Sequence, residues 1–439
     1  MVESVKVESA WYRARHSRIS VAAVVAFTLF TDMLVYGVVI PTLPILVIDR
    51  LHGDSAKVGF LFGIYAFGLL LATPVFAILS DRYQNRRYPM ILGMFGLVVS
   101  TLCFAVADTY VLLVLARIAQ GVSGGASWTI GLGMLADVFP TNKLGVVMGT
   151  VLTAHTVGFA IGPAIGGFLY EYAGFGAPFM FCSSVAAINL LAIVWLAEPN
   201  HDLKDKGFTS DQVSRAQEDV EVTESTPLIR VPTEPKQVIT MISLMKNWRI
   251  MSCVLCVTVS ASVFAGIEPA LPIHLQKVYN ASASTIGLIF VTMVIPAFLA
   301  PLIGHLSDKV GRQAISATGM ILMAVVSPIV AIKFESMYWI IPPLMLFGLS
   351  SPVTLTPVLP EMGETVNEMG GAAYAQVYAL YNMAYSIGMF IGPVVAGLIM
   401  TNFDFETLML VFGIALIACS PVMLDWAAVY RKVVRCFRK

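Results

Sequence analysis

The sequence has 439 residues, of which 57% are hydrophobic and 12% are charged, and its mean hydropathy is +0.80. Soluble domains contain about 45–50% apolar and about 25% charged residues, so this composition excludes an ordinary soluble protein. The formal net charge is zero, which leaves no basic excess for binding nucleic acid. We therefore predict an all-α membrane protein.

Apolar stretches long enough to cross a hydrocarbon core of about 30 Å as a helix recur about twelve times along the chain. We place them near residues 19–47, 58–80, 88–107, 110–136, 146–170, 177–197, 250–276, 285–306, 315–333, 337–360, 372–400 and 407–429. The charged first 18 residues contain no short apolar core with a cleavage site, so we expect the first of these helices to direct insertion.

The loops between these stretches differ in charge. If the N-terminus is cytosolic, nearly all of the 27 lysines and arginines lie in loops on that same side. The opposite loops contain only Arg50, Lys57, Lys277 and Lys333, and Arg117 lies within a span. Because basic loops stay in the cytosol, we expect both termini there.

The segment 198–249 is polar, contains three prolines and lacks a sustained apolar period, which is typical of a flexible cytosolic linker. It separates two six-helix halves. The predicted organisation is a cytosolic N-terminus (1–18), a first half (19–197), the linker (198–249), a second half (250–429) and a cytosolic C-terminus (430–439).

Three short motifs repeat between the halves at offsets of about 227 to 230 residues. They are Pro41-Thr-Leu-Pro44-Ile with Pro269-Ala-Leu-Pro272-Ile, Asp81-Arg82 with Asp308-Lys309, and Ile161-Gly162-Pro163 with Ile391-Gly392-Pro393. A nearly constant offset predicts parallel structural repeats, with a site between the halves near the midplane and alternating access by rocking.

The segment Gly304-His-Leu-Ser-Asp308-Lys309-Val-Gly311-Arg312 resembles the loop signature of the major facilitator superfamily. Its first-half counterpart around Asp81 and Arg82 departs by replacing the glycine and gaining one residue. Such clusters can hold one conformation by ion pairs that break in another, although ordinary anchoring at the membrane edge is the alternative. We assign a conformational gate to Asp81, Arg82, Asp137, Asp308, Lys309, Arg312 and Glu364.

Two further motifs support the resemblance. Arg117, in Ala116-Arg117-Ile-Ala-Gln120-Gly121, is similar to the helix 4 signature of proton-coupled members. The stretch Gly158-Phe-Ala-Ile-Gly162-Pro163-Ala-Ile-Gly166-Gly167 is similar to the helix 5 signature of antiporters. Its glycines clear one helix face for close approach, and Pro163 permits a kink, so a purely packing role is the alternative.

Within this superfamily the chain most resembles vesicular monoamine transporters and their fungal drug-efflux relatives. The resemblance rests on Ile267-Glu268-Pro269-Ala-Leu-Pro272-Ile, Gly131-Leu-Gly-Met-Leu-Ala136 and Gly166-Gly167-Phe-Leu-Tyr170-Glu171. It implies that Asp32 is the amine-binding aspartate of helix 1 and that Glu268 is a second functional carboxylate.

The chain also departs from that group. The positions of its helix 2 lysine and helix 11 aspartate are matched by Tyr65 and Asn382, so both partners of a charge pair are neutral together. Two aromatic positions that flank the amine are matched by Pro296 and Met389, whereas Tyr385 keeps a ring. The proton relay and the substrate can therefore differ from those of the amine carriers.

Asp32, Arg117 and Glu268 are the charged residues placed clearly inside spans, and each costs roughly 2.5–3.5 kcal/mol to insert. Two acids and one base leave one carboxylate unpaired. Burial disfavours its ionised form, so this carboxylate is stable when it holds a proton or faces a cation. Our hypothesis is that Asp32 is this shared site, and the alternative is a structural Asp32–Arg117 bridge.

Other polar residues in the spans are weaker candidates. His155 can relay protons or simply accept hydrogen bonds as a neutral imidazole. Asn382 and Tyr385 can orient a polar ligand or bridge helices. The paired cysteines Cys253 and Cys256 lie on a lipid-embedded helix, where packing is favoured over redox or zinc chemistry.

We predict a secondary transporter, not an enzyme, that exports or sequesters a small, cationic or amphipathic organic solute in exchange for protons. A proton-coupled importer or facilitator and a non-transporting solute sensor remain alternatives. No nucleotide-binding loop is present, so we expect no cofactor, a proton gradient as the energy source, and no metal. The expected partners are substrate, protons and lipids, and we expect a monomer.

Two surface signals concern location. Glu224-Ser-Thr-Pro-Leu228-Ile229 resembles an acidic dileucine signal and would favour a vacuolar or vesicular membrane over the plasma membrane. Asn280-Ala-Ser282 is a glycosylation sequon, but its loop is too short for use to be expected.

Overall fold

The computed structural model is all helical over the residues that it describes. These are 15–83, 86–197, 241–369 and 374–423, without the side chains of 80–83, 141–142, 242 and 374–375. Within them, 12 helical segments are long and apolar enough to cross a membrane, which confirms the predicted number of spans. The dileucine-like sequence and most of the predicted linker lie outside the described residues.

The first six spans form one bundle, which we call the first half. Its helices are α2 (Arg18–Ile45), α3 (Ser55–Tyr83), α4 (Arg87–Ala105), α5 (Tyr110–Val138), α6 (Thr141–Ala173) and α7 (Ala177–Trp195). The π-helix η1 (Leu46–Arg50) extends α2. Pro41 and Pro44 lie inside α2 and Pro163 lies inside α6, so both repeat motifs that contain proline fall within helices.

The last six spans form the second half, which begins after a short helix, α10 (Met241–Met245). Its elements are α11 (Trp248–Tyr279), α12 (Ala283–Val294), η2 (Ile295–Leu299), α13 (Ala300–Val310), α14 (Arg312–Val330), η3 (Met337–Ile340), α15 (Ile341–Leu355), α16 (Val358–Glu368), α17 (Tyr374–Asn402), α18 (Phe405–Cys419) and η4 (Ser420–Met423).

Side chains at the helix ends fix where several spans begin. Ser17 accepts a hydrogen bond from the backbone N–H of Ile19, and Thr109 accepts one from Leu112. Asn247 caps α11 in the same way, and Ser282 caps α12 through the N–H of Thr285. The first N–H groups of a helix have no partner within it. These short polar residues accept their hydrogen bonds and so fix where each helix begins.

Two spans of the second half are interrupted. The span 283–310 changes to 3-10 geometry at η2, where Pro296 removes a backbone donor, and a turn ending at Pro357 separates α15 from α16. Proline cannot donate to the helical ladder, so the chain bends where it occurs. The sequence alone predicts these spans as continuous helices.

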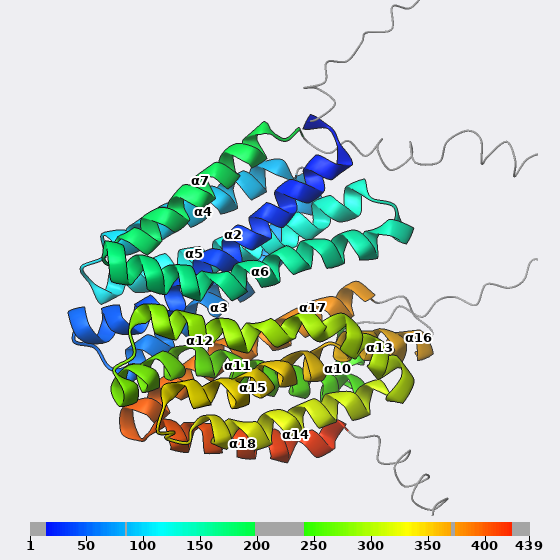
Figure 1. Ribbon diagram of the computed structural model, residues 1–439. Coiled ribbons are helices and arrows are strands. Elements are labelled where there is room, and N and C mark those ends of the chain that lie inside the picture. Colours follow the sequence, from blue (N-terminus) through cyan, green and yellow to red (C-terminus); the bar gives the residue numbers. More distant parts are fainter. Residues whose placement is uncertain (1–14, 84–85, 198–240, 370–373, 424–439) are drawn as a thin grey trace, which may run out of the picture.

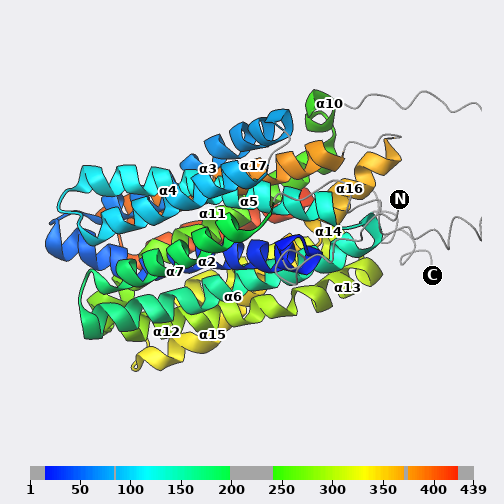
Figure 2. The same ribbon diagram turned by 90° about the horizontal axis from the view of Figure 1, so that it is seen from above.

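The two halves lie against each other with their helices running along one common axis (Figures 1 and 2). We call the end that carries the α2–α3 and α11–α12 connections the Asp49 end, and the opposite end, which carries α16, the Asp137 end. The ribbons of the halves approach each other at the Asp49 end and spread apart toward the Asp137 end (Figure 1).

Glycines allow the halves to touch along two seams at the Asp49 end. Between α6 and α12, a Cβ atom on Gly167 would lie 2.1 Å from the carbonyl oxygen of Ala283, and one on Gly287 would lie 2.2 Å from that of Pro163. Between α3 and α17, a Cβ on Gly59 would lie 2.1 Å from the Pro393 oxygen. No larger residue fits at these positions without moving a backbone.

Candidate substrate and proton site

The predicted charged residues meet at the centre of the molecule. Asp32 comes from α2, Arg117 from α5 and Glu268 from α11, and all are at most 5% exposed. Tyr65 of α3 completes the group. Three helices of the first half and one of the second therefore place their costly polar side chains in one region between the halves.

Glu268 is bonded across the two halves. The hydroxyl of Tyr36, one helical turn beyond Asp32 on α2, donates a hydrogen bond to Oε2 of Glu268. A buried carboxylate without a partner would be strongly destabilising, so Tyr36 stabilises Glu268 at this position. Tyr385 of α17 lies within electrostatic range of the same carboxylate.

Asp32 is less satisfied. Its Oδ1 is buried and has no hydrogen-bond partner among the described residues. The carboxylate and the Tyr65 hydroxyl both face Gly124 of α5, where a Cβ atom would lie 2.7 Å from the hydroxyl oxygen and 3.2 Å from each carboxylate oxygen. The Asp32 carboxylate and the Tyr65 hydroxyl therefore pack closely against α5, and a residue larger than glycine at this position would collide with them.

Arg117 is surrounded by aromatic rings. Its guanidinium carbon lies 5.2–5.9 Å from the centres of four rings, those of Tyr36, Phe62, Tyr65 and Phe104. Nη1 donates to the side-chain oxygen of Gln120 at 3.3 Å, whereas Nε and Nη2 have no hydrogen-bond partner in the described part of the chain. Ring faces attract a cation, and a desolvated cation–π contact is worth about 2 kcal/mol.

Arg117 forms no ion pair with either carboxylate within the described residues. The structural Asp32–Arg117 bridge, which the sequence left open, is thus not formed in this conformation. The rings of Tyr36 and Tyr65 contact the guanidinium, while the Tyr36 hydroxyl bonds Glu268 and the Tyr65 hydroxyl lies beside Asp32.

The other predicted site residues are spread around this centre. His155 of α6 lies edge-on to Trp128 of α5, with ring centres 5.3 Å apart. Tyr385 stacks on Tyr381 along α17 at 6.5 Å, and Asn382 is half-buried on the same helix. None of these three predicted residues hydrogen-bonds to Asp32 or Glu268 in the described residues.

The sequence reasoning did not single out Tyr36, Gly124 or the rings around Arg117. Tyr36 follows Asp32 by four positions, so helical spacing alone would have placed both on one face of α2. Gly124 follows Gln120 by four positions, so the same helical spacing would have placed both on one face of α5. The rings of Phe62 and Phe104 come from other helices and have no such signal.

The predicted packing glycines of α6 divide between two partners. Gly158, Gly162 and Gly166 approach α2, and Cβ atoms there would lie 2.4–2.9 Å from the backbone of that helix. Gly167 faces α12 of the second half instead, and Pro163 contacts both helices, with its ring near Gly37 of α2 and its carbonyl oxygen near Gly287 of α12. One helix thus packs tightly on both its own half and the other.

The predicted gate residues lie at the Asp137 end and pair within each half. Asp137 accepts a hydrogen bond from Nε of Arg86 at 2.9 Å. Arg312 bonds Asp308 at 3.0 Å and also bonds Glu364. The side chains of Asp81 and Arg82 are not described, and Lys309 is exposed.

The pairs Arg86–Asp137 and Arg312–Glu364 are equivalent in the two halves. Arg86 and Arg312, like Asp137 and Glu364, are about 226–227 residues apart, which is close to the offset of the repeated motifs. The first-half loop departs from the family signature by one extra residue and a replaced glycine. It nevertheless keeps the ion pair that its second-half counterpart forms.

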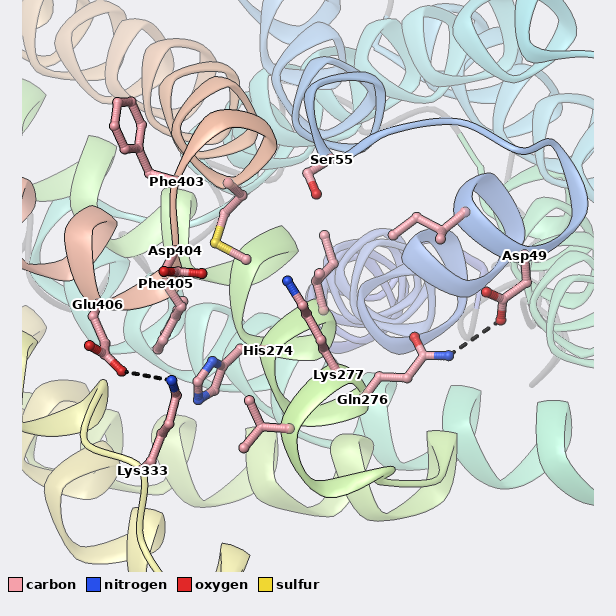
Figure 3. Close-up of a pocket in the computed structure, with 14 residues that line it drawn as sticks. Asp49, Ser55, His274, Gln276, Lys277, Lys333, Phe403, Asp404, Phe405 and Glu406 are labelled. Atoms are coloured by element: carbon pink, nitrogen blue, oxygen red, sulfur yellow. Dashed lines mark hydrogen bonds and ion pairs between the residues drawn. The ribbon is translucent and has the colours of Figure 1, made fainter.

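A cavity of about 330 Å³ lies at the Asp49 end, away from Asp32 (Figure 3). It is bordered by both halves, with Asp49 contributed by η1 and His274 and Lys277 by α11. Lys333 pairs with Glu406 at its edge, with 3.2 Å between Nζ and Oε1, and Gln276 donates to Asp49 (Figure 3).

This twelve-span fold, with buried charges between two repeated halves, defines a secondary active membrane transporter. The sequence model of the Major Facilitator Superfamily matches residues 25–267 and 250–433. The chain belongs to this family, whose members are transporters and not enzymes, and the predicted fold is confirmed.

Individual relatives share about a quarter of their residues with the chain. An uncharacterized MFS-type transporter of Schizosaccharomyces pombe is 26% identical over 90% of this chain and 93% of its own length. The synaptic vesicular amine transporter of Rattus norvegicus is 28% identical over 85% of this chain and 67% of its own length.

Among solved structures, a point mutant of the nucleoside transporter NupG has a TM-score of 0.70 and covers 92% of this chain and 98% of its own. Its sequence identity is 11%, so this likeness concerns the fold alone. The predicted similarity to vesicular amine transporters and to fungal transporters is confirmed by the sequence relatives.

Proposed function

We propose that this transporter exchanges a small organic solute, cationic or amphipathic, for protons, and that proton and solute compete for Asp32. The observation that carries the proposal is the buried Oδ1 of Asp32, which makes no hydrogen bond among the described residues and packs beside the Tyr65 hydroxyl against Gly124. A carboxylate in such surroundings is stable when it holds a proton or faces a cation, and binding one displaces the other.

The similarity to the synaptic vesicular amine transporter supports an amine or another organic cation as the solute. Tyr65 in place of a lysine adds a hydroxyl beside Asp32 without a second positive charge. A cationic solute near Asp32 therefore meets an aromatic ring and a hydrogen-bonding group, while the guanidinium of Arg117 lies against the rings of Tyr36 and Tyr65.

Glu268 and Arg117 have supporting roles in this proposal. Glu268 of the second half accepts a hydrogen bond from Tyr36 of α2, so a movement of α2 changes the surroundings of Glu268. The Arg117 guanidinium is shared among four rings, and it supplies a fixed positive charge that favours a negative charge on the neighbouring acids. Asn382, Tyr385 and His155 are proposed to line the solute path.

We also propose that the Asp137 end faces the cytosol. The basic residues Arg86, Arg249 and Arg312 cluster at that end, as the charge rule for membrane loops requires. The halves spread at the same end (Figure 1), so solute would enter the central site from the cytosol and be exported or sequestered. The ion pairs there are proposed to stabilise this spread arrangement.

The test is substrate-triggered proton movement in vesicles that contain the purified protein. A panel of organic cations and neutral metabolites is applied to the wild type, to Asp32→Asn and to Asp108→Asn, which changes an exposed aspartate as a control. We expect proton release with one class of compound in the wild type and the control, and none in Asp32→Asn.

Other outcomes separate the alternatives. Solute flux without proton flux would replace antiport by facilitated diffusion. Proton and solute moving in the same direction would make the protein an importer. Binding of a compound to the purified protein without any flux would favour a sensor, and unchanged coupling in Asp32→Asn would remove Asp32 from the shared site.

A further inference from the structure

Glu171 forms a contact between the halves that the central site does not use. It lies at the end of α6, and its Oε2 accepts hydrogen bonds from the hydroxyl of Ser284 at 2.6 Å and from the backbone N–H of Ser284 at 3.1 Å. Ser284 lies in the first turn of α12, in the second half. A side chain of the first half therefore caps a helix of the second.

The chemistry of this contact favours it, although the Glu171 side chain itself is exposed. The first N–H groups of a helix have no intrahelical partner, and the helix dipole favours a negative charge there. Ser282 caps the same helix end through the N–H of Thr285, and its hydroxyl lies 3.0 Å from that of Ser284. The Glu171 carboxylate thus completes a cap that α12 begins with its own residues.

The contact also lies at a mechanically important place. Gly167, one turn before Glu171, touches the backbone of Ala283, so the α6–α12 seam ends at this carboxylate. In the described part of the chain, other hydrogen bonds that join the halves at the Asp49 end run from Gln276 to Asp49 at 3.3 Å and from the N–H of Ala56 to Thr401 at 2.9 Å. The bond from the Ser284 hydroxyl to Glu171 is shorter than both, and it pairs a carboxylate with a helix N-terminus.

We propose that Glu171 is a positioning residue for transport, which holds the Asp49 end closed by capping α12 across the halves. Opening of this end must separate α6 from α12, and it then removes the carboxylate from Ser284. The strength of the cap therefore sets how often the closed end opens, and hence the balance between the two access states. This inference rests on the proposed alternating access but not on the identity of the solute.

The experiment measures a distance across the Asp49 end without substrate. Spin labels are attached at Val106→Cys, at the end of α4, and at Tyr338→Cys, in η3, in a background without other reactive cysteines. Both positions are well exposed and belong to different halves. Pulsed electron resonance then reports the populations of short and long distances for the wild type and for each variant.

We expect Glu171→Ala to raise the ratio of long to short distances by about three- to tenfold, since a charge-assisted hydrogen bond is lost. Glu171→Gln keeps an oxygen acceptor for Ser284 but loses the charge, so it should raise the ratio less than Glu171→Ala does. The control is Glu406→Ala, which breaks the Lys333–Glu406 pair at the same end but within the second half, and it should leave the ratio unchanged.

Two outcomes would overturn the proposal: the same distance ratio in Glu171→Ala as in the wild type, or an equal change in Glu406→Ala. Because no solute takes part, a failure to detect transport of any compound would bear on the proposed function alone. Conversely, the distance ratio can fail to change in a protein that exchanges solute for protons normally, and that result would reject the Glu171 contact only.

Discussion

Tyr36 and Glu268 belong to the first helix of each half, and the Tyr36 hydroxyl donates a hydrogen bond to the Glu268 carboxylate at the buried centre. This bond joins α2 to α11 beside the two prolines that each helix contains. The two halves thus contact each other through a polar bond at the site as well as through the glycine seams.

Removal of this hydroxyl should destabilise the protein. Tyr36→Phe leaves the buried Glu268 carboxylate without its donor, which costs about 1–3 kcal/mol. Thermal unfolding of the purified protein in detergent measures the effect. Tyr110→Phe is the matched control, because the Tyr110 hydroxyl bonds the Lys57 carbonyl at the exposed edge. Equal losses in the two variants would contradict a special role for the Tyr36–Glu268 bond.

A methyl group added at Gly124 should reduce transport without unfolding the protein. In Gly124→Ala the new methyl group would lie 2.7 Å from the Tyr65 hydroxyl and 3.2 Å from the Asp32 carboxylate oxygens, so these groups must move. Gly149→Ala is the control, since no described atom lies within 4 Å of a Cβ there. Solute-driven proton flux should fall only in Gly124→Ala; normal flux in it would show that transport does not need the close packing of Asp32 and Tyr65 against Gly124.

Lysine should not replace Arg117. A guanidinium presents a flat face to several rings, whereas an ammonium is a compact, strongly hydrated charge that loses more on burial. Arg117→Lys should therefore lower the unfolding temperature and the transport rate together. Arg50→Lys is a suitable comparison, because Arg50 lies 4.7 Å from the Phe175 ring centre at an exposed position. A fully active Arg117→Lys would argue that positive charge alone is needed.

The ion pair of Arg312 and Glu364 should respond to exchange of its charges. Glu364→Arg alone places two cations together and should slow transport, and the double variant Arg312→Glu with Glu364→Arg should recover part of the rate. Because exposed pairs are worth only about 0–1 kcal/mol, unfolding temperatures should change little. Vesicle flux assays measure the rates; no recovery in the double variant would assign Arg312 to another partner, such as Asp308.

The spans and the central acids could be predicted because lipid imposes simple rules on a sequence. The number of long apolar stretches determines the number of membrane helices. A charged side chain within such a helix avoids lipid and lies between helices, where Asp32, Arg117 and Glu268 are buried. The partner of each charge was less predictable. From the sequence, Arg117 could have paired with either acid. In the structure it instead contacts rings from three other helices and donates a hydrogen bond to Gln120.

The bends in the helices and the contacts between the halves could not be predicted from the sequence either. Pro296 indicates a possible break in a helix, but whether the chain turns or only kinks depends on the neighbouring helices. Glu171 was recognised only as part of a family-like motif. Its contact with Ser284 depends on how the two halves dock, and no local pattern in either half encodes that relation.

The two glycine seams have a consequence for leakage. At the Asp49 end the backbones of α6 and α12 touch, and so do those of α3 and α17, so along these described helices neither seam leaves a side entrance for an acyl chain or a small solute. The closed Asp49 end is therefore tight at both seams. This tightness rests on backbone contact, which no rotation of a side chain can loosen.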